Sequence, residues 1–196
     1  MTHTETESEM EPAMLAVFKN ALREIIVNNG YILDQESFDL VQKIVPWPAT
    51  EVCLVNARGE LLLHHRHFKE WPGELGNILD WYIPGGYMKA HDTIEDLCKK
   101  HLEKDGVVAN FEYRDEIAGV YKWSPGEHPV HFPLSVLCVC RLKGEITFRP
   151  GTEHMFRFTD KVVPTAVPAH TKLQEMFFWW RNHNLHLFKR ELKQSA

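Results

Sequence analysis

One feature limits the possible folds of this chain more than any other. It is a strand that ends in Ile83-Pro84-Gly85-Gly86 and leads through a short loop into a charged helix. We expect the helix over residues 92–105, closed by Gly106. Pro-Gly-Gly alone marks any tight turn. Between a strand and an acidic helix, however, glycines let the backbone approach a ligand closely, and a carbonyl oxygen there can coordinate a hard cation. The segment therefore predicts a strand–loop–helix unit at a ligand site.

The last turn of the expected helix carries an acid in an unusual place. Helical spacing puts Asp105 on the mostly apolar, inward face, together with His101. A carboxylate there opposes the helix dipole and needs a cation, a donor or a metal as partner. One interpretation is a His–Asp hydrogen bond, and the other is a carboxylate ligand for Mg²⁺ beside a diphosphate. Spacing alone leaves both open.

The rest of the chain alternates strand and helix patterns around this central helix. A polar, acidic start over residues 1–10 precedes two amphipathic helices, and a third long helix is expected from Thr171 to Leu192. This order favours a mixed α/β sandwich. The strands are expected at 51–56, 60–65, 80–83, 117–122, 134–142 and 145–148, with turns at 125–126 and 143–144.

Composition removes several classes of function. The chain of 196 residues, 44% hydrophobic, fits one domain with terminal additions, and a net charge of -5 makes nucleic acid a poor partner. Its acidic start and the absence of a long apolar run argue against secretion and membrane insertion. The four cysteines show no CxxC spacing, so we expect a reduced cytoplasmic protein.

The glycine–helix segment resembles the signature box of the Nudix superfamily, whose members cleave nucleoside diphosphates linked to another group. Gly86 is followed after five residues by Asp92, as in the first half of that box. The second half is reduced, because Lys100, His101 and Lys104 stand where the family has an arginine and glutamates.

A closer resemblance is to the GDP-mannose mannosyl hydrolase branch, which has a similarly reduced box. It covers about residues 34–175 and rests on an N-terminal helix at 34–46, a hairpin at 55–66, the approach to the box at 81–86 and a late loop at 152–156. The resemblance implies a Nudix-type α/β/α sandwich of mixed-sheet (α+β) type, with added N-terminal and C-terminal helices. Residues 1–33 would be an acidic tail and extra helix, and 34–196 the Nudix-like domain.

The same resemblance implies an activity and a site. The activity is Mg²⁺-dependent hydrolysis of a nucleoside diphosphate sugar such as GDP-mannose, with water attacking the anomeric carbon and nucleoside diphosphate leaving. The Gly86 carbonyl, Asp105 and Glu153 would hold Mg²⁺, Arg66 would stabilise the diphosphate, and His154 would be the base. One Mg²⁺ plus an arginine can support that leaving group, and one base can activate the water.

Two further expectations concern substrate and partners. Trp81 and Trp71, the latter in a longer loop over 67–80, are candidate substrate-binding residues, since that loop composition suits a lid or a base-stacking wall. Apolar residues of the terminal helices, as in the branch, would form a homodimer. The alternative function is a catalytically impaired nucleotide-binding or regulatory protein, favoured by His101 and Lys104 in place of glutamates. Cleavage at phosphorus is a third interpretation, which these replacements disfavour.

Overall fold

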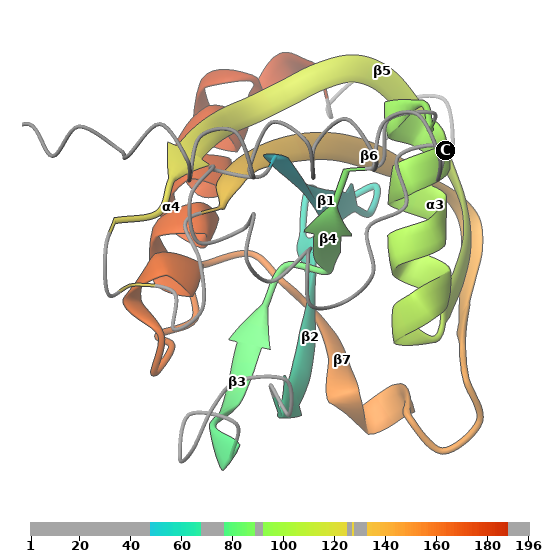
Figure 1. The fold of residues 1–196 in the computed structure, drawn as a ribbon. Coiled ribbons are helices and arrows are strands. Elements are labelled where there is room, and N and C mark those ends of the chain that lie inside the picture. Colours follow the sequence, from blue (N-terminus) through green and yellow to red (C-terminus); the bar gives the residue numbers. More distant parts are fainter. Residues whose placement is uncertain (1–47, 68–76, 89–91, 125–126, 128–132, 188–196) are drawn as a thin grey trace, which may run out of the picture. The chain divides into compact units, whose positions relative to one another are not determined.

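A seven-stranded mixed sheet organises the described part of the computed structural model, which comprises residues 48–67, 77–88, 92–124, 127 and 133–187 (Figure 1). The strands are β1 (Pro48–Val55), β2 (Leu61–His67), β3 (Leu79–Tyr82), β4 (Gly85–Tyr87), β5 (Val107–Lys122), β6 (Leu134–Phe148) and β7 (Phe156–Thr159). The described helices are α3 (Ile94–Asp105), the short 3-10 helix η2 (Glu153–Met155) and α4 (Pro168–His183).

The strand order is β3-β2-β1-β6-β5, with β4 paired to β1 and β7 paired to β2. The β1–β6 pair is parallel, with Val52 opposite Cys138, and every other pair is antiparallel. Apart from its first residue, β1 is buried along its length, which is why it reads as a nearly continuous apolar run.

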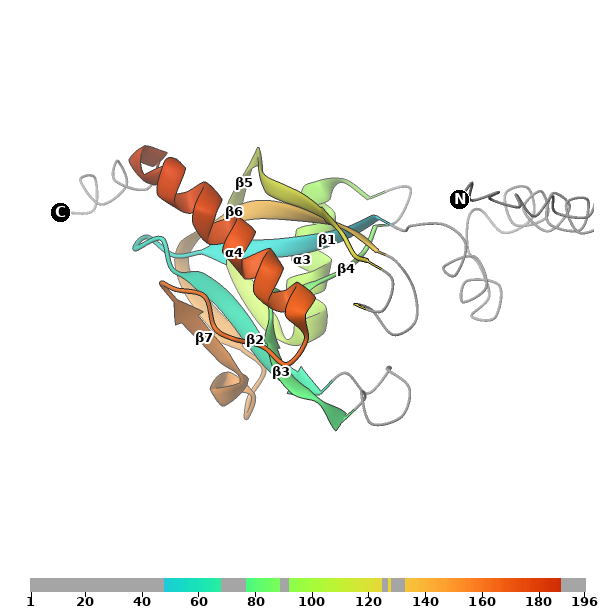
Figure 2. The same ribbon diagram turned by 90° about the vertical axis from the view of Figure 1, so that its left-hand side faces the viewer.

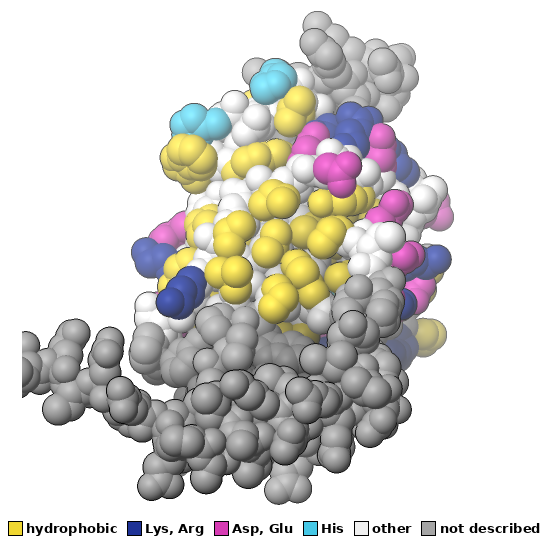
Figure 3. Space-filling view, turned by 45° about the horizontal axis from the view of Figure 1, so that its top comes forward, with side chains coloured by type: hydrophobic (Ala, Val, Ile, Leu, Met, Phe, Trp, Pro, Cys, Tyr) yellow, Lys and Arg dark blue, Asp and Glu magenta, His cyan; other side chains and the backbone are white. Residues whose placement is uncertain are grey.

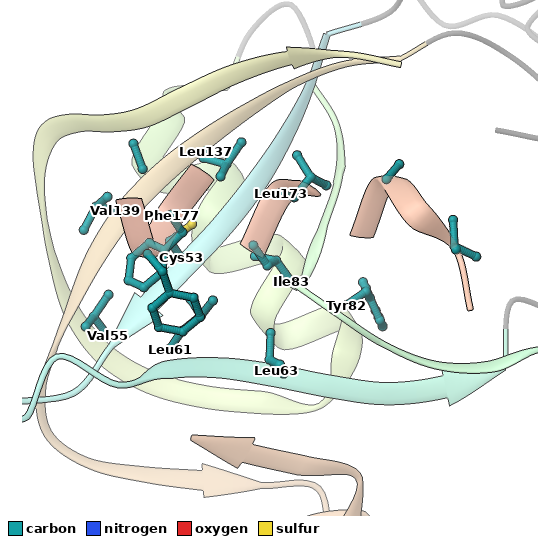
Figure 4. Packing of buried hydrophobic residues seen from close by; sticks show 14 of the residues in the cluster. Cys53, Val55, Leu61, Leu63, Tyr82, Ile83, Leu137, Val139, Leu173 and Phe177 are labelled. Carbon is teal, nitrogen blue, oxygen red and sulfur yellow. The ribbon is translucent and has the colours of Figure 1, made fainter. Parts of the chain in front are cut away.

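Helices cover both faces of the sheet, as Figure 2 shows, with α4 on one side of the strands and α3 on the other. Alternate residues of β1 enter opposite cores because strand side chains have a period of two. Cys53 and Val55 pack in the α4 core with Leu173 and Phe177 (Figure 4), whereas Leu54 belongs to the α3 core. The expected α/β/α sandwich is therefore confirmed.

Local sequence fixes both ends of α3. The Thr93 side chain caps the helix by accepting a hydrogen bond from the Asp96 amide at 3.1 Å. Gly106 ends it in the left-handed conformation (φ 92°), where glycine carries no steric penalty. The predicted closing residue is confirmed, and the helix starts two residues later than expected.

Several predicted boundaries were wrong, including both ends of the C-terminal helix expected at 171–192. Strand β5 begins at Val107, ten residues before the expected start, and β6 runs through Lys143-Gly144 without the expected turn. Helix α4 begins at Pro168 and ends at His183. Among the described helices, none is both long and apolar enough to cross a bilayer. The two predicted N-terminal helices, the 33/34 boundary, Trp71 and most of the 67–80 loop lie outside the described residues.

Exposed apolar side chains gather on the face formed by β5 and α4 (Figure 3). The largest described members are Ile117 and Val120 of β5 and Trp179 of α4, which is 64% exposed. The neighbouring Phe177 and Phe178 are instead buried in the core. Some of the C-terminal aromatics were expected to pack on the core and some to form a dimer, and among the described ones Trp179 is strongly exposed.

Candidate functional site

Asp105, the inward acid of α3, has three partners from the sheet. Its side chain is only 2% exposed. The Tyr82 hydroxyl donates a hydrogen bond to Oδ2 at 2.8 Å, and His64 Nδ1 lies 3.3 Å from the same oxygen. The Arg66 Nη1 atom lies 3.6 Å from Oδ1. The acid therefore meets a histidine, as one interpretation expected, but it is His64 of β2 rather than the expected His101.

These partners keep the buried carboxylate ionised. Burial alone would raise the pKa of Asp105, but the His64 hydrogen bond and the Arg66 charge outweigh it and lower that pKa below its usual value. The pKa of Tyr82 shifts in the opposite direction. Burial and the nearby Asp105 charge raise the pKa of the phenol well above its usual value, so Tyr82 remains a proton donor.

Gly85 and Gly86 allow very close packing of β4 against its neighbours. Strand β4 pairs with β1, so Gly85 lies opposite Glu51 and Gly86 opposite Thr50. A Cβ atom added at Gly86 would lie 2.6 Å from Cε1 of the buried His101 ring. At Gly85 an added Cβ would lie 2.6 Å from the Thr50 carbonyl and would also meet the Glu51 carboxylate. The two glycines therefore have a packing role, whatever ligand they approach.

Replacing Gly85 with alanine should lower the free energy of unfolding by about 2 kcal/mol, because the Thr50 carbonyl belongs to a buried strand that cannot give way. Gly119→Ala is the matched control: its added Cβ would meet the flexible end of Met176, 2.5 Å away, which can move aside. Urea denaturation of both variants checks this. An equal or larger loss for Gly119→Ala would contradict it.

Glu51 is a second buried carboxyl at the site, and the sequence analysis missed it. Ser135 donates a hydrogen bond to Oε1 at 2.7 Å, and the Trp123 indole donates to that hydroxyl at 2.9 Å. Burial raises the pKa of Glu51 to about 7; the Ser135 hydrogen bond lowers it and the Asp105 charge raises it further. An ionisable residue in the mostly apolar run of β1 was the signal that could have identified it.

The raised pKa of Glu51 predicts a stability that depends on pH. Glu51 stays protonated in the folded protein up to about pH 7, whereas it ionises near pH 4.5 in the unfolded chain. The contribution of Glu51 to the free energy of unfolding is full below pH 4.5 and is lost as pH rises through about 7. The free energy of unfolding of Glu51→Gln, relative to wild type and measured by urea denaturation, should rise by about 2 kcal/mol between pH 5 and pH 8. Exposed Glu145→Gln is the control, and an equal pH response in both variants would contradict the prediction.

Asp80 forms a separate, structural cluster at the start of α4. Its Oδ1 accepts hydrogen bonds from the Trp81 and Ala166 amides, and its Oδ2 accepts one from the Val167 amide at 3.1 Å. His170 Nδ1 lies 3.2 Å from Oδ2. Burial would raise the pKa of Asp80, but the hydrogen bonds lower it below its usual value. Asp80 of β3 therefore anchors Ala166 and Val167, the two residues that precede α4.

Glu153 and His154, the late-loop residues, lie on η2. Both side chains are exposed, and η2 packs against β2, the strand that carries Arg66. Within the described residues, neither side chain forms a hydrogen bond or an ion pair with Asp105. The structure thus brings Arg66 and Asp105 together directly and leaves Glu153 and His154 on a neighbouring turn.

Trp81, the candidate substrate-binding aromatic, is already stacked. The His65 ring lies parallel to it, with centroids 4.4 Å apart and planes at 9°. The Arg157 guanidinium lies 4.1 Å from its centroid. Both groups already contact the ring that was expected to stack on a base.

The predicted Mg²⁺ ligands do not fit a divalent cation in this arrangement. Asp105 has donors on Oδ2 and the Arg66 cation beside Oδ1, and Mg²⁺ would need a lone pair at about 2.1 Å. A second cation there would be repelled by Arg66. Across the described ranges, no three His, Cys, Asp or Glu side chains are grouped so as to hold a metal.

The geometry agrees with a known class of fold. No family model matches the sequence, and neither does any curated protein. Among solved structures, the MutT protein from Methanosarcina mazei Go1 is 14% identical (TM-score 0.51), covering 72% of this chain and 97% of its own. A possible asymmetric diadenosine tetraphosphate hydrolase from Jonesia denitrificans is 14% identical (TM-score 0.53), covering 71% and 97%. A UDP-X diphosphatase is 16% identical (TM-score 0.51), covering 89% and 82%. At these identities the likeness shows the fold, which is of the Nudix type.

Proposed function

We propose that the protein is an enzyme that hydrolyses a nucleoside diphosphate joined to a sugar, with water attacking the anomeric carbon. The observation that carries this proposal is Arg66, a cation fixed against Asp105 beside the strand–glycine–helix unit while 24% of its side chain stays exposed. Two of the structurally similar proteins are described as acting on nucleotide derivatives, UDP-X and diadenosine tetraphosphate. GDP-mannose, implied by the sequence resemblance, is the first substrate to test.

Attack at carbon suits the charges of this site. The bond between the anomeric carbon and the glycosidic oxygen breaks, the water oxygen bonds to carbon, and the nucleoside diphosphate departs with the electron pair. Arg66 offers guanidinium donors to the diphosphate, where negative charge develops. Because the predicted ligands do not fit Mg²⁺ as they stand, no step of this proposal depends on a bound metal.

The water needs a base, and two residues are candidates. His154 is the base implied by the sequence resemblance, and its exposed position on η2 leaves it accessible to a substrate. Glu51 is favoured by a different observation, a pKa of about 7 beside Asp105. A general base works best when its pKa lies near the working pH. His154 remains the first proposal and Glu51 the second.

A panel of nucleotide sugars, with and without Mg²⁺, tests the activity. Chromatography should show free sugar and nucleoside diphosphate as products. His154→Ala should reduce turnover by 10²-fold or more, on the order of a lost general base, while nucleotide binding persists. Unchanged turnover in His154→Ala together with its loss in Glu51→Gln would transfer the base role to Glu51.

The second candidate function is a Nudix-fold protein that binds a nucleotide without turning it over. The ion pair between Arg66 and Asp105 favours it, since that carboxylate already has its cation. No turnover of any substrate in the panel, combined with a nucleotide-dependent rise in melting temperature, would support this function and exclude the enzyme.

A homodimer in the cytoplasm is also proposed. The exposed apolar side chains of β5 and α4, Ile117, Val120 and Trp179, would suit such an interface. Sedimentation velocity of the full chain tests this, and Trp179→Lys should shift the protein toward monomer if α4 takes part.

A further inference from the structure

The carboxylate predicted to bind a metal is instead built into a support for an arginine. Three contacts hold Asp105 or Arg66 in place. Tyr82 donates to Asp105 at 2.8 Å, its ring lies 4.9 Å from the Arg66 guanidinium carbon, and Arg66 faces the carboxylate at 3.6 Å. His64 Nδ1 adds a contact to the Tyr82 hydroxyl at 2.9 Å. One aromatic side chain thus bridges the acid and the cation.

This support leaves Arg66 both fixed and reachable. Asp105 is 2% exposed and cannot move into solvent with its partner, whereas Arg66 is 24% exposed. A guanidinium carries five N–H donors, and Asp105 faces its Nη1 end. Ordering a long cation before a ligand arrives reduces the entropy lost on binding.

A divalent cation and the Arg66 guanidinium would compete for Asp105. Direct coordination requires a carboxylate oxygen at about 2.1 Å from the metal. Such a metal would share the buried carboxylate with the Arg66 guanidinium, and the two cations would repel each other at low dielectric. Arg66 therefore disfavours a metal at Asp105.

We propose that Asp105 is a positioning residue for Arg66, and that the site binds the diphosphate of its ligand without a divalent cation at Asp105. This rests on the proposed function, because it takes the nucleoside diphosphate group as the ligand. It goes beyond that function in assigning Asp105 a role through Arg66 and in removing the metal from this carboxylate.

Two measurements on the full chain test this without relying on turnover. Calorimetry with GDP and UDP in EDTA should show binding that added Mg²⁺ does not strengthen. Electron paramagnetic resonance with Mn²⁺, in the absence of nucleotide, should show the same free Mn²⁺ signal for wild type and Asp105→Asn. Mn²⁺ binding by wild type that Asp105→Asn abolishes would overturn the proposal, and so would nucleotide binding that requires Mg²⁺.

A double-mutant cycle separates positioning from general structural damage. Asp105→Asn should weaken GDP or UDP binding about tenfold in the wild-type background and leave it unchanged in the Arg66→Gln background. An equal loss in both backgrounds would make Asp105 merely structural. Tyr82→Phe, which removes one donor to Asp105 and keeps the ring, provides a milder variant with the same expected dependence on Arg66. If neither nucleotide binds under any condition, the proposed function itself fails, whereas binding only with Mg²⁺ overturns this inference alone.

Discussion

Replacing Arg66 with glutamine should lower kcat/KM for a nucleoside diphosphate sugar by about 10²- to 10³-fold. Glutamine keeps hydrogen-bonding capacity but removes the charge that supports the departing diphosphate. The effect should fall mainly on kcat, because charge on the leaving group grows in the transition state. Arg66 lies against buried Asp105, so the melting temperature must be measured in parallel.

Arg157→Gln is the matched control, since Arg157 is an exposed cation on β7, which pairs with the same strand, β2. It stacks on Trp81 and has no contact with Asp105 in the described structure. Its loss should change kcat/KM by less than about tenfold. Comparable losses of kcat/KM in the two variants would mean that Arg66 contributes only to the overall positive potential of the site.

Replacing Asp80 with alanine should lower the free energy of unfolding by about 3 kcal/mol, the largest stability effect among the substitutions proposed. The substitution removes the acceptor of three backbone amides at the junction of β3 with the start of α4, and it leaves His170 buried without its acid. Buried donors that lose their acceptor incur the full desolvation cost. The midpoint of urea denaturation should fall accordingly.

Asp160→Ala is the control for this effect. Asp160 is an exposed acid whose charge interacts with Arg181 near the other end of α4. Its removal should cost less than about 1 kcal/mol, as for most surface ion pairs. A loss below 1 kcal/mol for Asp80→Ala would contradict the view that Asp80 anchors the residues preceding α4.

The inward direction of Asp105 could be predicted from sequence, and its partners could not. Helical periodicity alone places the residue on the buried face of α3, and burial then demands a partner. Tyr82 and His64 reach it because β2 and β3 pair with His64 opposite Tyr82, and that register comes from tertiary structure. The sequence therefore predicted the need for a partner and gave the wrong histidine.

Strand β5 shows a second limit. The run Glu112 to Glu116 is charged and was not expected to lie in a strand, yet it belongs to β5. Edge position explains this, because a strand paired on one side only can carry charges outward. Irregular register between Tyr113 and Ile117 also breaks the alternation on which strand prediction depends.

Glu51 was missed because it lies outside the glycine–helix motif. The glycine–helix segment drew attention to α3, whereas Glu51 comes from β1 and meets the segment only through the pairing of β1 with β4. The metal ligands, the base and the substrate aromatics stay predictions. The fold they were predicted for is confirmed.

Hydrolysis in H₂¹⁸O tests the central claim most directly, because the oxygen of water marks the atom that it attacks. A nucleotide sugar that the protein turns over is incubated in labelled water, and mass spectrometry locates the label before the free sugar exchanges. Attack at the anomeric carbon predicts ¹⁸O in the sugar and an unlabelled nucleoside diphosphate. Label in a phosphate group, with sugar phosphate and nucleoside monophosphate as products, would contradict the account.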